Sequence, residues 1–335
     1  MFLSSWLFFF GTYYTITDRS ATTFRGPASI TSRGRVRGLA KSRGQIARDG
    51  RHNLSRIRVP SDINVRVVAL LAVRNEIRYL ERCLCHLRAQ GVESWVIDNS
   101  SNDGSLDLVR SFLGNGVLGV ENYPYPGFFD WRGLLKRKAE VAQSLEADWF
   151  IHHDADEIRE TVPPWSSLLE GLAAVDAEGY NAVSFDEFVF LPTGDDESYE
   201  GIDYVEFMRY YYFFRPADRH RVNAWKKQPQ GVDLASSGGH EVMFSGRRLY
   251  PRNFVLRHYV ALSRKHLISK YSSRSYSKEE VEVLGWHRGR AYFSASSVFL
   301  PSAQCLKRLG AHGFDRSEPW RSHPFLPQEP SMSLT

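Results

Sequence analysis

The stretch Trp149–Glu157 reads WFIHHDADE, in which apolar residues are followed by two histidines and three carboxylates. The apolar residues are typical of a buried strand. Carboxylates that lie close together repel one another and are costly to keep in a fold without a neutralising cation. Asp154 and Asp156 can share one divalent ion if the chain turns after the strand, and Mg²⁺ and Mn²⁺ favour such oxygen ligands. A solvated acidic turn is the alternative.

Strands and helices alternate in the sequence before this stretch. The apolar run Val65–Val73 predicts a strand buried on both faces, and Ile77–Gln90 has apolar residues at helical spacing. Further strands are predicted at 92–98, 117–122 and 148–153, and further helices at 105–113 and 131–145. This alternation predicts an α/β fold with a mostly parallel, doubly wound sheet and helices on both of its faces.

Polar side chains follow three of these predicted strands. In open parallel sheets, ligands bind at the carboxyl ends of the strands. No G-x-G-x-x-G and no P-loop follows the first strand, so hydrogen bonds to a base or a ribose are expected there instead. An ionised Asp98 suits a ribose hydroxyl or a base N–H, because it only accepts hydrogen bonds. We expect these residues to share one site: Arg74, Asn75, Glu76, Asp98, Ser100, Asp154 and Asp156.

Three of these segments resemble motifs of family 2 glycosyltransferases. Residues 98–105, DNSSNDGS, resemble the D-D-x-S-x-D-G-[ST] loop of that family, and AVRNE at 72–76 and D-x-D at 154–156 fit its order and spacing. Asn99 is a departure, because the family often has a second aspartate there; a hydrogen-bonding role survives and a charged one does not. The resemblance covers about residues 65–290.

The resemblance implies a Rossmann-like GT-A fold. It also implies transfer of a sugar, with inversion, from a UDP- or GDP-linked donor to the hydroxyl of a glycan, lipid or protein acceptor. In that family the D-x-D carboxylates hold Mn²⁺ or Mg²⁺, which stabilises the charge of the departing diphosphate. The implied metal ligands are Asp154, Asp156 and His258, with a structural histidine as the alternative for His258. The implied donor contacts are Arg74, Asn75, Glu76, Asp98, Ser100 and Asp154.

The basic run at 136–138 lies on the predicted helix before the fourth strand. Lys138 is the member of this run that we expect to add positive charge beside the diphosphate. A solvated helix face is the alternative.

An inverting transfer also needs a base within hydrogen-bond reach of the acceptor hydroxyl. The segment at 238–241 reads GGHE, and paired glycines let a backbone approach a substrate closely. Glu241 is the first candidate, followed by His240 and then by Asp186 with its neighbour Glu187. Trp225 and Trp286 are candidates for an acceptor-sugar platform, with core packing as the alternative.

The remaining regions set the domain organisation. Aromatic strands are predicted at 181–191 and 205–214, in a smaller mixed β region of an acceptor half at 161–295 that follows a nucleotide-sugar half at 63–160. We expect residues 296–335, rich in Pro and Ser, to be loosely structured. We expect residues 1–62 to form a disordered basic tail.

The formal net charge is +5 over 335 residues. Eleven Lys and Arg against one acid fall between residues 19 and 58, so the rest of the chain is slightly acidic. The composition therefore gives no support for nucleic-acid binding. Three cysteines without zinc-ligand spacing favour a reducing compartment. We expect a cytoplasmic protein whose basic tail makes weak peripheral contact with the inner membrane face.

Two other classes of function remain open. One is a nucleotidyltransferase or a nucleotide-sugar phosphohydrolase, which would also use carboxylates and Mg²⁺; the Gly-rich basic loop that such enzymes usually have after the first strand is absent here. The other is a non-catalytic module that binds a sugar or a nucleotide.

Overall fold

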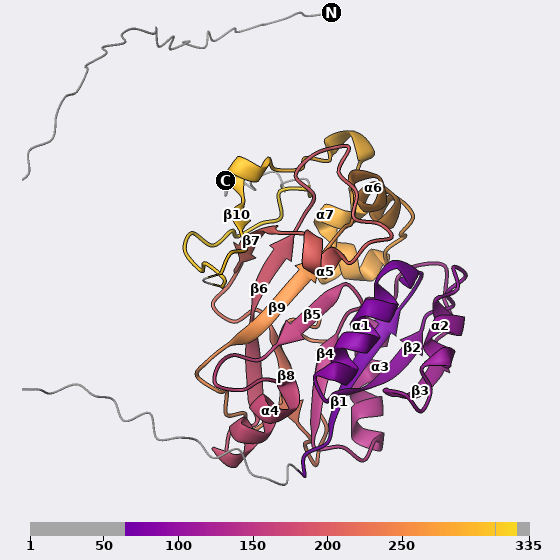
Figure 1. Ribbon diagram of the computed structural model, residues 1–335. Helices are drawn as coiled ribbons and strands as arrows, with labels where there is room; N and C mark the ends of the chain where they lie inside the picture. The colour runs from indigo at the N-terminus through magenta and orange to yellow at the C-terminus, as the bar shows by residue number, and fades with distance from the viewer. Residues whose placement is uncertain (1–63, 312, 327–335) are drawn as a thin grey trace, which may run out of the picture. The chain divides into compact units, whose positions relative to one another are not determined.

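The computed structural model describes residues 64–311 and 313–326 (Figure 1). The expected basic tail at 1–62 lies outside these residues. Among the helices at 64–311 and 313–326, none has the length and apolar character needed to cross a bilayer.

A parallel sheet with helices on both faces forms the first half of the described chain. Its strands lie side by side in the order β3-β2-β1-β4, and each pair in this group is parallel. The predicted α/β fold class is confirmed (Figure 1). The strands are β1 (Val67–Val73), β2 (Glu93–Asp98), β3 (Val117–Asn122) and β4 (Trp149–His153), and the helices are α1 (Ile77–Ala89), α2 (Ser105–Ser111) and α3 (Trp131–Ser144).

Side chains of β1 alternate between two hydrophobic clusters, one on each face of the sheet. Ala69 and Leu71 belong to the cluster that contains the buried residues of α1. Val68 and Leu70 belong to the cluster that contains the buried residues of α3. Because successive side chains of a strand point to opposite faces, a strand covered on both sides is apolar at every position. This explains the continuous apolar run.

The second half extends the same sheet with mostly antiparallel strands. Strand β8 pairs antiparallel with β4, and β6 then pairs with β8. Strand β9 pairs parallel with β6 and antiparallel with β5, which places His258 opposite Glu157. The elements are β5 (Glu157–Glu160), α4 (Leu168–Ala177), β6 (Ala182–Phe190), β7 (Tyr210–Phe214), β8 (Val222–Lys226), β9 (Phe254–Tyr259) and α6 (Arg264–Ser272).

The strand predicted at 205–214 is wrong in its first half. A short helix, α5 (Tyr204–Phe207), precedes β7. The carboxylate of Asp203 accepts a hydrogen bond from the N–H of Val205 and so caps this helix. The local cap outweighs the aromatic pattern.

The described part of the segment expected to be loose packs against the aromatic strands. Strand β10 (Lys307–Arg308) pairs with β7. Phe314 stacks on Phe188 with 4.0 Å between ring centroids, and Trp320 stacks on Tyr212 at 4.7 Å. These aromatic residues are too far apart in the sequence to give a periodic signal, although each one covers part of the sheet. The other short elements are η1 (Glu279–Val283), a π-helical turn, α7 (Arg288–Ala291), η2 (Ala295–Ser297) and η3 (Ala303–Cys305).

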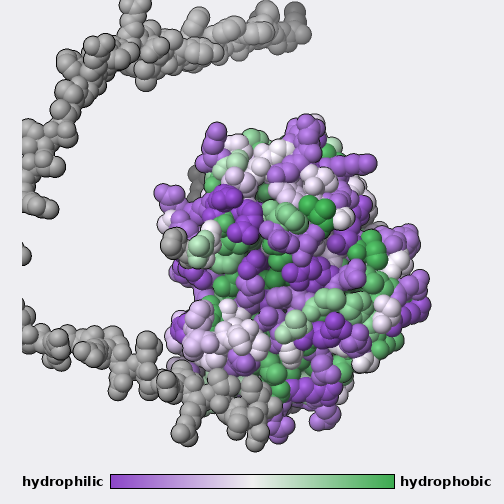
Figure 2. Space-filling model, in the orientation of Figure 1, coloured by the Kyte–Doolittle hydropathy of each residue, from purple (hydrophilic) through white to green (hydrophobic). Residues whose placement is uncertain are grey.

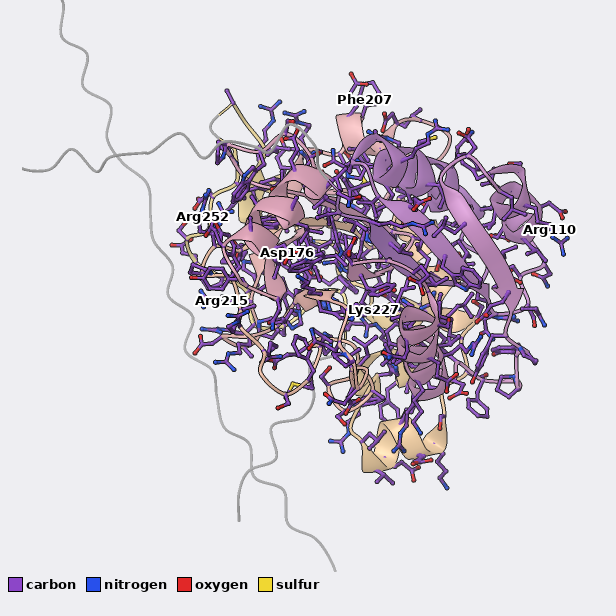
Figure 3. The ribbon with its side chains drawn as sticks, turned by 90° about the horizontal axis from the view of Figure 1, so that it is seen from below. Arg110, Asp176, Phe207, Arg215, Lys227 and Arg252 are labelled. Carbon is purple, nitrogen blue, oxygen red and sulfur yellow. The ribbon has the colours of Figure 1, made fainter. Side chains whose placement is uncertain are left out.

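The surface is mixed in character. On the face drawn in Figure 2, hydrophilic and hydrophobic residues are interspersed. Seen from below, Arg110 of α2 lies at the outer edge (Figure 3) and pairs with the exposed Asp107 at 3.4 Å. Such exposed pairs contribute little to stability.

Candidate functional site

A cavity of about 580 Å³ lies at the carboxyl ends of β1 and β4, and α6 and α7 contribute to its walls. Of the residues expected at the site, seven line it: Arg74, Asn75, Glu76, Asp154, Asp156, His240 and His258. Five expected residues are not among its lining residues: Asp98, Ser100, Lys138, Asp186 and Glu241.

The loops that follow β1 and β2 hold each other in place. The guanidinium of Arg74 donates to the carbonyl oxygens of Asn99 and Ser100 at 2.6 and 2.7 Å and lies 3.6 Å from the ring centroid of Tyr125. The amide oxygen of Asn75 accepts from the N–H of Asn102 at 2.8 Å. Asn75 and Ser100 have φ values of 57° and 56°, a conformation that non-glycine residues adopt at a cost. Arg74 and Asn75 therefore shape the rim of the cavity.

Asn99, rather than Asp98, lines the cavity from the end of β2. Asp98 is fully buried, and one of its oxygens accepts from the N–H of Ser101 at 3.1 Å. Ser100 uses its hydroxyl to accept from the N–H of Tyr125. Neither residue lines the cavity, so the donor contacts expected from Asp98 and Ser100 stay predictions; the second carboxylate oxygen of Asp98 is buried and has no partner among the described residues. Asn99 donates to the carbonyl of Tyr123, while its buried amide oxygen has no partner among the described residues.

Asp156 is neutralised by two groups from the second half of the chain. One of its oxygens lies 2.6 Å from Nζ of Lys270 and 3.4 Å from Nε2 of His258. Burial by itself raises the pKa of Asp156, but the charges of Lys270 and His258 outweigh it and hold that pKa well below its usual range. Asp154 is more open, with 33% of its side chain exposed, and lies 3.6 Å from Nζ of Lys138.

His258 lies between two carboxylates. Its Nδ1 is 2.7 Å from Glu187, and its Nε2 faces Asp156. Burial lowers the pKa of this imidazole, but the Asp156 and Glu187 carboxylates raise it to about 10. A ring that is protonated on both nitrogens has no lone pair for a metal.

This donor set does not fit a divalent ion in its present arrangement. His258 has its nitrogens directed at Glu187 and Asp156, and Asp156 already contacts the ammonium of Lys270. No group of three or more His, Cys, Asp or Glu side chains within 64–311 and 313–326 is arranged to hold a metal ion. Dependence on Mn²⁺ or Mg²⁺ stays a prediction.

Lys138 lies beneath the acidic loop rather than in the cavity. It is fully buried, and its Nζ donates to the carbonyl of His153 and lies 3.0 Å from Nδ1 of His152. Burial lowers its pKa to about 8, against the opposing charge of Asp154. Lys138 therefore fixes the end of β4 and does not line the cavity, and its expected contribution of charge beside the diphosphate stays a prediction.

Of the four candidate bases, Glu241, His240, Asp186 and Glu187, only His240 lines the cavity. Glu241 pairs with Arg247, and Asp186 binds Asn253 and Arg316. Neither carboxylate lines the cavity and each has a cationic partner outside its lining, so a role as the base stays a prediction for both. The ring of His240 stacks on that of His220 with 4.8 Å between centroids.

The backbone conformation and the close packing at positions 238 and 239 explain why both residues are glycines. Their φ values of 64° and 86° favour glycine, and an added Cβ would come within 3.2 Å of Trp286 and 3.1 Å of His152, respectively. Trp286 lines the cavity. Trp225 is buried in the core beside Phe150, so its expected role as an acceptor platform is corrected.

Four cations of the second half line the cavity and were not predicted as site residues: Arg221, Lys270, Arg274 and Arg290. Arg221 pairs with Glu187, and Arg274 pairs with Glu76 at 3.0 Å. The sequence held a signal for Lys270 and Arg274. Together with His266 they are spaced by four residues, as on one face of a helix. That pattern alone does not distinguish a cavity wall from a solvated face.

The comparisons with known proteins give distant structural likenesses only. No protein-family model matches the chain, and no curated protein matches its sequence. The structure is similar to that of S. aureus TarS residues 1–349, a GT-A glycosyltransferase, with 12% identity, coverage of 69% of this chain and 73% of that chain, and a TM-score of 0.38. The TarS complex with UDP gives 11% identity, coverage of 66% and 71%, and a TM-score of 0.38.

A third similar structure is a putative glucose-1-phosphate thymidylyltransferase from Bacillus anthracis in complex with a sucrose. It shares 11% identity, covers 54% of this chain and 69% of its own, and has a TM-score of 0.25. With TM-scores below 0.5, none of these likenesses supports an argument about function. A function has to be inferred from the residues of the cavity.

Proposed function

We propose that this chain transfers a sugar from a nucleoside-diphosphate donor, UDP- or GDP-linked, to an acceptor hydroxyl. The observation that supports the proposal most is the composition of the cavity at the carboxyl ends of β1 and β4. It combines an unpartnered amide oxygen with carboxylates and several Lys and Arg side chains. Open α/β sheets bind their ligands at this edge.

Asn99 suits the base of the nucleotide. Its buried amide oxygen has no partner among the described residues, and a buried acceptor left unpaired costs about 1–3 kcal/mol. Uracil and guanine each present a ring N–H that can donate to this oxygen. The same site therefore fits UDP and GDP.

The reaction needs charge stabilisation and a base. The bond between the anomeric carbon and the diphosphate oxygen breaks, and its electron pair remains on the diphosphate. The acceptor oxygen bonds to the anomeric carbon and loses its proton. His240 fits the role of the base because it lines the cavity and is neutral, since burial and the charges of Arg221 and His220 hold its pKa well below its usual range. Inversion and dependence on Mn²⁺ or Mg²⁺ stay predictions, and the acceptor class stays open between glycan, lipid and protein.

Calorimetry with UDP and GDP tests the donor site. At least one of them should bind, and Asn99→Leu should raise its Kd at least tenfold. Asn102→Ala is the matched control, since this exposed residue of the same loop donates its backbone N–H to Asn75, a contact that the substitution keeps. If neither nucleotide binds in any condition, the proposal fails.

Sugar release from the donor, measured with and without acceptor, separates a transferase from a hydrolase. His240→Gln should lower kcat at least 100-fold while the donor Kd changes less than twofold. Glu241→Gln, one residue away and paired with Arg247 outside the cavity lining, should retain its activity. A large loss of kcat in Glu241→Gln, with kcat retained in His240→Gln, would assign the base to Glu241 and contradict the role of His240.

A further inference from the structure

We infer that Lys270 and Arg290 bind the donor's diphosphate and stabilise its charge as the sugar departs, so that transfer proceeds without a divalent cation. This inference rests on the proposed function and concerns the same cavity. It follows from the contacts of Asp156, from the free donors of two cations and from the formal charge of the cavity.

Lys270 occupies the position beside Asp156 that a shared metal would need. Its Nζ lies 2.6 Å from the Asp156 carboxylate and 3.2 Å from the carbonyl of Val260. An ammonium group has three donors, and these two partners leave one donor free. The side chain is only 8% exposed and lines the cavity, so the free donor is available to a ligand inside it.

Arg290 is a cavity cation without a carboxylate partner among the described residues. Its guanidinium lies 5.8 Å from the ring centroid of Tyr271, and Tyr271 is its hydrogen-bond partner. By contrast, Arg221, Lys270 and Arg274 each pair with a carboxylate. Arginine presents a planar fork of donors that matches phosphate oxygens, so a diphosphate is a suitable partner for this group.

The formal charge of the cavity lining favours an anion by itself. Six Lys and Arg side chains line the cavity against three carboxylates; Arg221 and Arg78 pair with Glu187 and Glu200 outside the lining, which leaves an excess of one positive charge with histidines left out of the count. A diphosphate carries negative charge on both phosphates and gains more when the sugar departs. Fixed cations that face this developing charge lower the barrier, because they need no reorganisation during the reaction.

The step balances without a metal. The electron pair of the breaking bond stays on the diphosphate oxygen, where hydrogen bonds from Lys270 and Arg290 strengthen. The acceptor's proton goes to His240, so Lys270 and Arg290 keep theirs. Asp156 holds the ammonium of Lys270 in position.

The decisive measurement is the Kd of UDP and GDP for the full chain in EDTA, and then with added Mn²⁺ or Mg²⁺. Binding in EDTA within twofold of that with metal supports the inference. Binding that disappears in EDTA and returns with Mn²⁺ overturns it and leaves the proposed function intact. Absence of binding in every condition defeats the proposed function as well. This measurement uses the unaltered protein and needs no variant.

Variants then identify the cations. Arg290→Gln should weaken nucleotide binding at least tenfold. Arg288→Gln on the same short helix should change it less than twofold, because Arg288 donates to the carbonyl of Val281 and does not line the cavity. Equal effects of the two variants would overturn the assignment of Arg290.

Lys270→Ala tests the position beside Asp156. In EDTA this variant should bind the nucleotide at least tenfold more weakly, and Mn²⁺ should restore part of the binding, because removal of the ammonium frees Asp156 to act with Asp154. Lys270→Arg should retain binding in EDTA. If Lys270→Ala binds as the wild type does in EDTA, Lys270 does not hold the diphosphate.

Discussion

The two sides of the cavity differ in charge and in how their residues are neutralised. The first half of the chain supplies all three carboxylates of the lining, Glu76, Asp154 and Asp156, whereas the second half supplies four of the six Lys and Arg side chains and no carboxylate. Glu76 and Asp156 pair across the cavity with Arg274 and Lys270. The acidic strand ends are therefore compensated by the other half of the fold. The difference shows that a cluster of carboxylates does not by itself indicate a metal.

Glu157 contrasts with Asp156, because its nearest cation, Arg159, comes from its own half, and Arg221 of the second half lies farther away at 3.9 Å. The carboxylate of Glu157 is buried and accepts from Arg159, also buried, at 2.7 Å. Arg159→Ala should lower the free energy of unfolding by about 3–5 kcal/mol, because it removes the nearest cation from a buried carboxylate and leaves only the longer pair with Arg221 at 3.9 Å. Urea unfolding measures this loss.

Arg257→Ala is the control for Arg159→Ala. Arg257 pairs with Glu160 in the same β5–β9 pair of strands, and both side chains are partly exposed. Its removal should lower the free energy of unfolding by about 1 kcal/mol or less. Equal losses of unfolding free energy in the two variants would mean that burial of the pair between Glu157 and Arg159 does not increase its contribution to stability.

The side of the cavity that the second half forms also contains a buried imidazole, which is neutral in the folded protein. His266 is buried in α6, and its Nδ1 accepts from the N–H of Leu262 at 3.2 Å. Burial, together with the charges of Lys270 and Arg78, lowers its pKa to about 3, against the opposing charges of Glu200 and Asp156. Protonation below the pKa of an unfolded histidine, about 6.5, therefore favours unfolding.

The stability contributed by neutral His266 is complete above about pH 6.5 and is lost as the pH falls toward 3. At pH 5 the loss should be about 2 kcal/mol for this one group. Urea unfolding of the wild type and of His266→Asn, at pH 8 and at pH 5, measures it. The variant should be less sensitive to acid by that amount. If both proteins lose the same stability between these pH values, His266 is not the group responsible.

The first half could be predicted from sequence because its signals are local. Each parallel strand is a continuous apolar run, and the polar residues that follow it lie at the ligand-binding edge by the geometry of the sheet. Asp154, Asp156, Arg74 and Asn75 were predicted in this way, and all four line the cavity. Asn99 lines the cavity and Asp98 does not, since the pattern gives the strand end but not which side chain turns toward the cavity.

The second half could not be predicted in the same way because its contacts are distant in sequence. Lys270 is 114 residues from Asp156, and Arg274 is 198 residues from Glu76. No local period records such a partner. Glu241 does not line the cavity, although its partner Arg247 is only six residues away: the paired glycines indicate a close backbone approach but not where the neighbouring carboxylate lies.

The pair formed by Glu76 and Arg274 gives the smallest effect and the most direct measure of how the halves are joined. The two atoms lie 3.0 Å apart, and the side chains are 13% and 26% exposed. A double-mutant cycle with Glu76→Gln and Arg274→Gln should give a coupling free energy of about 1 kcal/mol. Arg82 and Asp203, at 37% and 41% exposure, also pair across the two halves but at the surface, and their cycle should give about 0.3 kcal/mol. Urea unfolding measures both cycles. Equal couplings would show that the cavity pair is solvated like a surface pair, and the charge of the cavity would then be screened by water rather than available to a ligand.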